Sequence, residues 1–375
     1  MLLALLLIAA TPLTVFASAS DPLEALAKKA GCAYEDILTS DLVVPGESVS
    51  DWIAIATGCS ANPVKRNAYL KGLEDYVTKE YAENGGLHNI KATEYHRISL
   101  AVLALGGDPT GFGVDGNGEP IDLIADGTYN WSNSDSLGVQ GLNGWIFALI
   151  TLDAKNYEVP SDAVYTREDI ISAILGAQTD EGGFGLSVGT PDVDITAMAL
   201  QALAPYYQND PDVQGSVDRA LSWLSAQQGS GGDFTSWGSS TAEGTAQTVI
   251  ALCSLGIDPR TDERFMKNGN SAMDGLLQYQ TQSGMFKHTL DGDEDVMATE
   301  QAILALIAVE RLDQNGNRIY DFTEVAVYEG KDDTAAEKKP VSAAVWIAVA
   351  AGAALVAGGT AVVFIKRGKK KACMK

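Results

Sequence analysis

The chain has 375 residues, of which 46% are hydrophobic and 20% charged, so it has room for one large domain or two modest ones. Its formal net charge is −23, and every acidic residue precedes position 341. Because so acidic a surface repels phosphate backbones, the composition argues against a nucleic-acid partner. It is compatible with solubility outside a cell or with attraction of cationic ligands.

The N-terminal segment predicts a signal peptide over residues 1–19. An apolar run over residues 2–16 ends in Ala-Ser-Ala at positions 17–19, which is typical of a signal-peptidase site. No basic residue precedes Lys28, so the usual positive n-region is missing. A retained N-terminal anchor is the alternative.

The next region predicts a series of helices and carries two cysteines. Ser48, followed three residues later by Asp51, predicts a capping box that starts a helix ending at Gly58. Cys32 and Cys59 lie on either side of this helix start. Because an oxidising exterior permits a disulfide, we expect these two residues to be bridged.

A frame of Gln-x3-Gly-x-Phe occurs three times at a spacing of roughly 50 residues. The copies begin at Gln178, Gln228 and Gln280, and each Gln closes an amphipathic helix. A polar loop follows each copy, and then an Ala-rich helix headed by a Thr-x5-Ala-Leu sequence. One such unit cannot bury its apolar face alone, so the repeats indicate stacked helical hairpins.

The clear repeats fix where these helices should lie. We expect outer helices over 166–178, 213–228 and 271–280, and inner helices over 192–206, 242–255 and 296–311. Degenerate copies of the repeat earlier in the chain bring the predicted total to six hairpins. The inner helices are apolar all round and the outer ones amphipathic, so the predicted fold is an all-α, (α/α)6 toroid over residues 20–325.

The C-terminal region predicts a membrane anchor. Residues 341–365 contain no charge and reach about 37 Å at 1.5 Å per residue, enough to cross a hydrocarbon core of about 30 Å. The basic tail, 366–375, belongs in the cytoplasm by the positive-inside rule. With residues 326–340 as a linker, we expect a single-pass protein of the cell membrane whose toroid is extracellular and whose partner through 341–365 is the lipid bilayer.

The repeated frame resembles the motif of squalene and oxidosqualene cyclases, with Phe where those usually have Trp. The segment from Pro191 to Ala197 resembles the region around the cyclase acid motif. The chain is thus similar to the α/α-toroid superfamily, which includes terpene cyclases, protein prenyltransferase β subunits, cobalamin carriers and thioester domains. It is most similar to membrane-anchored surface toroid proteins of Gram-positive bacteria, for which the resemblance implies a fold and no settled activity.

The resemblance also suggests a general acid. In a cyclase, the central carboxyl of Asp-x-Asp-Asp-Thr-Ala protonates an alkene, and neighbouring carboxyls support its acidity. By this resemblance Asp192 and Asp194 are the candidate catalytic residues, with Asp194 as the acid, but Ile195 replaces the third carboxylate. The alternative is that Asp192 caps a helix beginning near Val193 and Asp194 favours its positive end.

The sequence gives less support for a metal or cofactor site than for the helical repeat. A prenyltransferase-like zinc site needs Asp, Cys and His that converge, and Cys253 has no ligand spacing with the histidines. The loop from Asp313 lacks the glycine of a calcium loop at Arg318, so we expect no metal. Cobalamin stays open as a ligand, because the carriers use one toroid of this size and a segment resembling 194–196, although residues 312–340 are too few for their second domain.

We expect a ligand to enter where the N-termini of the inner helices gather. The loops there carry aromatic and acidic side chains beside a wall of small residues, the usual make-up of a pocket. The predicted ligand contacts are Trp131, Phe184, Trp237 and His288, with Asp194 beneath them. The preferred hypothesis is a module that binds a small molecule or a polypeptide, and the rival is a degenerate terpene-cyclase-like enzyme.

The predicted topology can be tested with protease added to intact cells. Because residues 341–365 would hold the tail inside, the protease should remove the chain up to about residue 335 and spare the tail. Immunoblots against each end report the result. A toroid that stays intact until the cells are lysed would contradict the orientation.

Overall fold

The computed structural model describes residues 20–60, 65–187 and 189–327. The predicted signal peptide, the predicted membrane span, the basic tail and all but two residues of the predicted linker lie outside these ranges. No helix within the described ranges combines the length and the apolar character that a membrane crossing needs.

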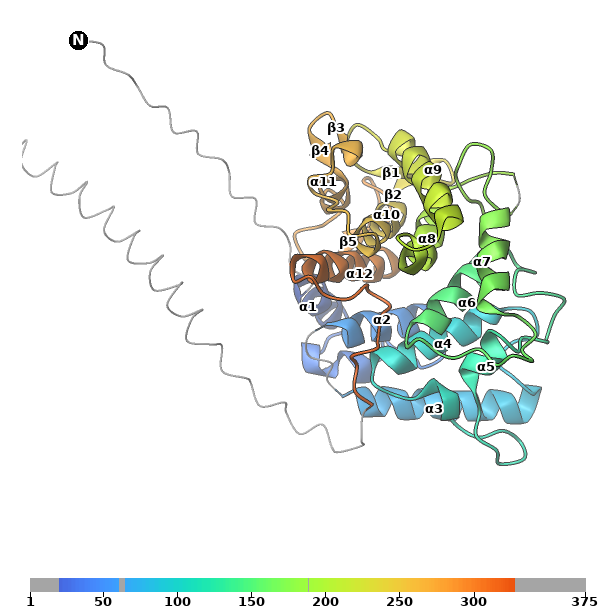
Figure 1. Ribbon diagram of the computed structural model, residues 1–375. Helices are drawn as coiled ribbons and strands as arrows, with labels where there is room; N and C mark the ends of the chain where they lie inside the picture. The colour runs from blue at the N-terminus through green and yellow to red at the C-terminus, as the bar shows by residue number, and fades with distance from the viewer. Residues whose placement is uncertain (1–19, 61–64, 188, 328–375) are drawn as a thin grey trace, which may run out of the picture. The chain divides into compact units, whose positions relative to one another are not determined.

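Six helices form a closed inner ring (Figure 1). Each packs against the next along the chain, and the last packs against the first, which closes the ring. In order they are α2 (Ser48–Cys59), α4 (Ala92–Ala104), α6 (Asn143–Asp153), α8 (Val193–Leu203), α10 (Ala242–Ser254) and α12 (Val296–Asp313). Their side chains are buried on almost every face, as the sequence predicted for inner helices.

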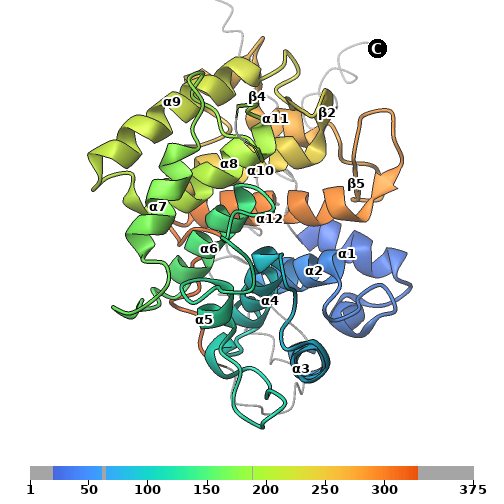
Figure 2. The ribbon, with the colours of Figure 1, turned by 90° about the vertical axis from the view of Figure 1, so that its right-hand side faces the viewer.

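Six further helices cover this ring from outside, and Figure 2 shows several of them at its periphery. They are α1 (Ser20–Lys29), α3 (Arg66–Asn84), α5 (Leu123–Gly127), α7 (Arg167–Gly176), α9 (Pro211–Gln227) and α11 (Ala272–Leu277). The outer helices α5, α7, α9 and α11 pack on α4, α6, α8 and α10, while α1 packs on α12. The predicted arrangement of helical hairpins in a toroid is therefore confirmed.

The loops contain more structure than the sequence analysis expected. Short 3-10 helices occur at η1 (Tyr34–Thr39), η2 (Pro109–Gly111), η3 (Ala204–Tyr206) and η4 (Glu263–Phe265). Antiparallel hairpins pair β1 (Phe234–Ser236) with β2 (Ser239–Thr241), β3 (Met266–Lys267) with β4 (Asn270–Ser271), and β5 (Phe286–Lys287) with β6 (Glu294–Asp295). The first and third hairpins lead directly into α10 and α12, so they set the direction in which these inner helices start.

In the first two repeated frames the glutamine ties one hairpin to the next. Gln178 donates from Nε2 to the carbonyl of Gly182 at 2.7 Å and to that of Ser216, on α9, at 2.8 Å. Gln228 donates in the same way to Gly232 and to Phe265. Because each of these two amides satisfies carbonyls in its own loop and in the following unit, it fixes the spacing between successive hairpins. Gln280 donates to the carbonyl of Gly284 in its own loop.

The threonine that heads each inner helix completes this connection. The backbone N–H of Phe184 donates to Thr196 Oγ1 at 2.8 Å, and Phe234 and Phe286 make the same bond to Thr245 and Thr299. All three phenylalanine side chains are fully buried. The Phe of each frame and the Thr of the following Thr-x5-Ala-Leu sequence therefore connect the loop to the start of its inner helix.

The glycine of each frame allows neighbouring units to approach closely. Gly232 has φ of +91°, and a Cβ there would lie 2.1 Å from the carbonyl oxygen of Ser271 at the start of α11. Gly284, with φ of +97°, faces Asp21 and Ala25 of α1 instead. The third frame thus docks on the first helix, which joins the two ends of the toroid.

Two local predictions are wrong. Cys32 and Cys59 are both free thiols: the first donates to the carbonyl of Ala27 and the second to that of Ile319, so no bridge forms between them. The capping box at Ser48 is also absent, because this helix has no side-chain cap. Asp51 instead turns inward to a buried arginine described below.

Phe184→Ala should lower the free energy of unfolding by about 3–5 kcal/mol, the usual cost of emptying an aromatic core site. Urea unfolding followed by tryptophan fluorescence measures it. Leu290→Ala, at a residue that is 47% exposed, is the control and should cost less than about 0.5 kcal/mol. A cost below about 1 kcal/mol at Phe184 would contradict its place in the core.

Candidate functional site

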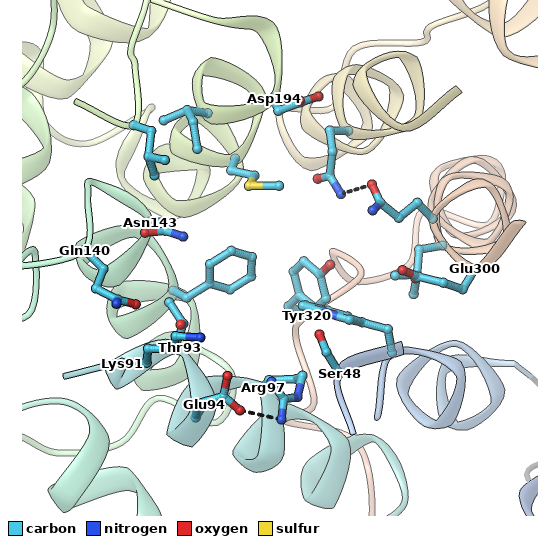
Figure 3. A pocket seen from close by; sticks show the side chains of 18 of the residues that line it. Ser48, Lys91, Thr93, Glu94, Arg97, Gln140, Asn143, Asp194, Glu300 and Tyr320 are labelled. Carbon is cyan, nitrogen blue, oxygen red and sulfur yellow. Dashed lines mark hydrogen bonds and ion pairs between the residues drawn. The ribbon is translucent and has the colours of Figure 1, made fainter. Parts of the chain in front are cut away.

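A central cavity of about 490 Å³ lies inside the ring. All six inner helices contribute to its wall, mainly through their first two turns, so the N-termini of the inner helices surround it. Figure 3 shows the polar side chains of the wall around an open centre. Those labelled there are Ser48, Lys91, Thr93, Glu94, Arg97, Gln140, Asn143, Asp194, Glu300 and Tyr320.

Asp194 reaches this cavity from the first turn of α8. Its Oδ2 accepts a hydrogen bond from Ser236 Oγ at 2.6 Å, and its Oδ1 is buried with no hydrogen-bond partner among the described residues. Burial raises the pKa of this carboxyl, against the hydrogen bond from Ser236 and the charge of His288, which lower it. Asp194 is thus a carboxyl that holds its proton more tightly than an exposed aspartate does.

Glu300, on the second turn of α12, is a second buried carboxyl in the wall. It is 1% exposed, and its Oε2 has no hydrogen-bond partner within the described ranges. Burial raises its pKa well above the usual value, and the nearby carboxylates Glu243 and Asp295 raise it further. The sequence analysis did not single out this residue, because a lone glutamate in an Ala-rich helix carries no motif.

A row of three glutamines connects three inner helices beside Glu300. Gln201 donates from Nε2 to Gln247 Oε1 at 2.8 Å, and Gln247 donates from Nε2 to Gln301 Oε1 at 3.0 Å. The row crosses from α8 through α10 to α12. Since each amide is held by the next, the wall offers a fixed pattern of hydrogen-bonding groups.

Arg97 faces the cavity, but its guanidinium group already forms ion pairs with two carboxylates of the protein. It donates from Nε to Asp51 Oδ2 at 2.9 Å, and it pairs with Glu94 at 2.7 Å. Asp51 also accepts hydrogen bonds from the Tyr69 hydroxyl and from the backbone N–H of Gly46. Burial raises the pKa of Asp51, whereas the charge of Arg97 and these hydrogen bonds lower it. This satisfied network explains why Asp51 does not cap its own helix.

Aromatic side chains form another part of the wall. The ring of Trp52 lies 5.9 Å from that of Phe147 and 6.3 Å from that of Tyr320, centroid to centroid. Tyr320 comes from the segment 318–325, which follows the last helix. This segment packs at the C-terminal ends of the inner helices, where Phe322 N–H donates to Ala154 O and Arg311 donates to the carbonyl of Ile319.

The structure brings some of the predicted site residues to the cavity and leaves others outside it. Trp237, 73% exposed in the turn between β1 and β2, lines the cavity together with Asp194. His288 is not in the wall but is bonded through Nδ1 to Glu243 at 2.9 Å. Asp192 is also outside the wall, because its Oδ1 accepts from Ile195 N–H as the cap of α8.

Two of the predicted ligand contacts, Trp131 and Phe184, lie in the core and not at the cavity. Trp131 is 1% exposed, packs edge-on against Tyr95 and donates from Nε1 to Ser134. Phe184 is completely buried in its repeat frame. Neither lines the cavity, since the aromatic residues of the frames serve the core of the toroid.

The residues do not fit a zinc site of the prenyltransferase type. Burial raises the pKa of Cys253 to about 12, which opposes the thiolate that zinc requires. Cys253 is also absent from the cavity wall. Within the described ranges, no group of three or more His, Cys, Asp or Glu side chains is arranged to hold a metal ion.

Comparison with known proteins gives the family and the fold. The sequence of residues 132–351 matches the family model named prenyltransferase alpha-alpha toroid domain. Protein geranylgeranyltransferase-I of Candida albicans, complexed with GGPP, has a chain that superposes with a TM-score of 0.54 at 11% identity, covering 84% of this chain and 100% of that chain. A search of curated proteins finds no match.

Two bacterial enzymes are more distant. A type II terpene cyclase from Scytonema has a TM-score of 0.44 at 14% identity over 71% of this chain and 88% of its own. An ent-copalyl diphosphate synthase from Streptomyces platensis has a TM-score of 0.45 at 20% identity over 70% and 50%. TM-scores and identities this low give no information about the site.

The buried state of Glu300 predicts a pH dependence of stability. Because its pKa is raised above the usual 4.5, the folded state binds the proton more tightly than the unfolded state, and stability falls as the pH rises above about 4.5. Glu300→Gln removes this titration. The free energy of unfolding of the variant, minus that of the parent, should therefore grow between pH 4.5 and 8.

Denaturant unfolding at a series of pH values measures this difference. Glu263→Gln changes an exposed glutamate on η4 and should follow the parent across the series. A Glu300→Gln curve parallel to that of the parent would show that Glu300 has a partner or is solvated.

Proposed function

Since the chain belongs to the prenyltransferase alpha-alpha toroid domain family, we propose that it binds a small organic molecule in its central cavity. The observation that carries the proposal is a partly open cavity of about 490 Å³ with a mixed wall. Pockets of this size, with apolar and aromatic surface and a few placed polar groups, are the usual sites of small ligands. The toroid is the receptor, and its rim at the inner-helix N-termini is the entrance.

The charge of the wall favours a neutral or positively charged molecule. The Candida albicans relative is complexed with GGPP, a diphosphate. Here Arg97 is already paired with Asp51 and Glu94, which leaves Lys91 as the other basic residue in the wall. Two buried carboxyls face the same space, so a diphosphate would lack the cations that it needs.

The same proposal includes the location of the receptor. With residues 341–365 in the bilayer and the signal peptide removed, the cavity would open to the outside of the cell. The acidic composition of the chain suits that role, since it keeps the surface soluble and raises the local concentration of cationic molecules.

A cyclase-like acid catalyst is the second candidate function. Asp194 supports it, because its pKa is raised, its Oδ1 is unpaired among the described residues, and it faces the space that Trp52 and Phe147 also line. The carboxyl proton would add to one alkene carbon, and the carboxylate would remain. Ile195 stands where a further carboxyl would assist, so Asp194 alone would have to supply the acidity.

Cobalamin is a third candidate, with a different mode of binding. A corrinoid would lie across the mouth of the cavity, against the exposed ring of Trp237. Binding of this kind would make Trp237 essential and would leave the interior empty.

Native mass spectrometry of the full-length protein, released from its own membranes in detergent, tests the proposal. We expect a small molecule to accompany the protein, and we expect Met198→Trp to remove it, because Met198 is a half-buried residue of the wall. Met266→Trp changes a half-buried methionine on β3, outside the cavity, and should keep the ligand.

The outcome separates the three candidates. Protein without any bound mass, or with a mass that survives Met198→Trp, would contradict binding in the interior. A mass lost on Trp237→Ala but kept in Met198→Trp would favour a ligand across the mouth. Conversion of an added polyene alcohol by the parent, lost in Asp194→Asn, would favour the cyclase-like function.

A further inference from the structure

We propose that the ligand of the central cavity is an organic ammonium ion, in which a positively charged nitrogen carries apolar substituents. This inference rests on the proposed function and names the class of molecule that the cavity accepts. Three features of the wall carry it: a buried carboxyl with one oxygen that lacks a partner among the described residues, a set of aromatic rings, and the distribution of charge around them.

The buried carboxyl is Glu300, which has a hydrogen bond with Gln301 and a second oxygen that lacks a partner among the described residues. Its side chain is 1% exposed, its Oε2 has no partner among the described residues, and it lies in the cavity wall, as Figure 3 shows. A buried polar group without a partner is rare in folded proteins, because its lost hydration is not replaced. A positively charged ligand would supply the missing interaction.

The charges around Glu300 favour a cation over a neutral donor. Glu243, on α10, and Asp295, at the start of α12, both act on Glu300 as like charges. His288 pairs with Glu243 at the exposed rim, and the charge of Glu300, after burial, raises the pKa of the Tyr320 hydroxyl. Because these like charges disfavour the ionised form of Glu300, a cation beside it would relieve the repulsion and stabilise the carboxylate.

The aromatic rings favour an organic cation over a bare metal ion. Trp52 and Phe147 belong to inner helices, yet both keep part of their surface open, and both line the cavity together with Tyr320. An ammonium ion with alkyl substituents gains from the faces of such rings while its substituents remain in contact with apolar surface. A hydrated metal ion needs several converging oxygen or nitrogen ligands instead.

Three features of the site would favour an anion. Lys91 lies across the cavity from Glu300 (Figure 3), and the other two are largely neutralised. The N-termini of the inner helices carry partial positive charge, but Asp192 and Asp295 cap two of them, and the effect fades beyond the first turn, whereas Glu300 lies on the second. Arg97 is held between two carboxylates, Asp51 and Glu94. None of these features therefore supplies a counter-ion to Glu300.

Calorimetric titration of the full-length protein with acetylcholine and with 3,3-dimethylbutyl acetate tests the inference. The two molecules have the same shape, but only the first is charged. We expect acetylcholine to bind at least about tenfold more tightly. Glu300→Gln should remove most of this preference, and Glu263→Gln should leave it unchanged. Trp52→Leu gives a second test, since it should weaken acetylcholine more than its neutral analogue.

Equal affinity for the two molecules would overturn the ammonium inference and leave the proposed small-molecule receptor standing. Failure of both to bind would also overturn the inference, and the mass spectrometry described above would then decide separately whether the cavity holds another ligand. If Glu300→Gln does not fold, the preference of the parent and its loss in Trp52→Leu still decide the question.

Discussion

Closure of the inner ring is the constraint on which the rest of the structure depends. An inner helix such as α4 is buried along nearly its whole length, so it is stable only when neighbours cover it on both sides. The contact of α12 with α2 supplies the last of these neighbours. The approach of Gly284 to Asp21 and Ala25 provides the same closure in the outer layer.

The site follows from this closure. Six helix starts meet at one end of the ring, and their first two turns form the wall of the cavity. At the other end the segment 318–325 packs across the helix ends, held by Arg311 and by the backbone of Ala154, and places Tyr320 in the wall. The toroid thus brings together Ser48, near its beginning, and Tyr320, near its end, in one site.

The ring contains two kinds of buried charge, and the difference between them is informative. Arg97 and Asp51 satisfy each other, with Tyr69 and Gly46 completing the network, so they rigidify two inner helices and need nothing more. Glu300 has no such partner for its Oε2 among the described residues. Burial without a partner lowers stability, and a protein that retains such a group at a cavity wall offers that group to a ligand.

The sequence by itself determined the repeat, the helical hairpins, the toroid and the helix cap at Asp192. These features are local: Gln178, Gly182, Phe184 and Thr196 lie within one repeat, and each acts mainly through neighbours close in the chain. Only the tertiary structure decided which aromatic residues face the core, as Trp131 does, and that Asp51 pairs with Arg97 instead of capping its helix. The surroundings of Glu300 were likewise decided only by the closed ring, because its burial and the lack of a partner for its Oε2 among the described residues depend on helices far apart in the sequence.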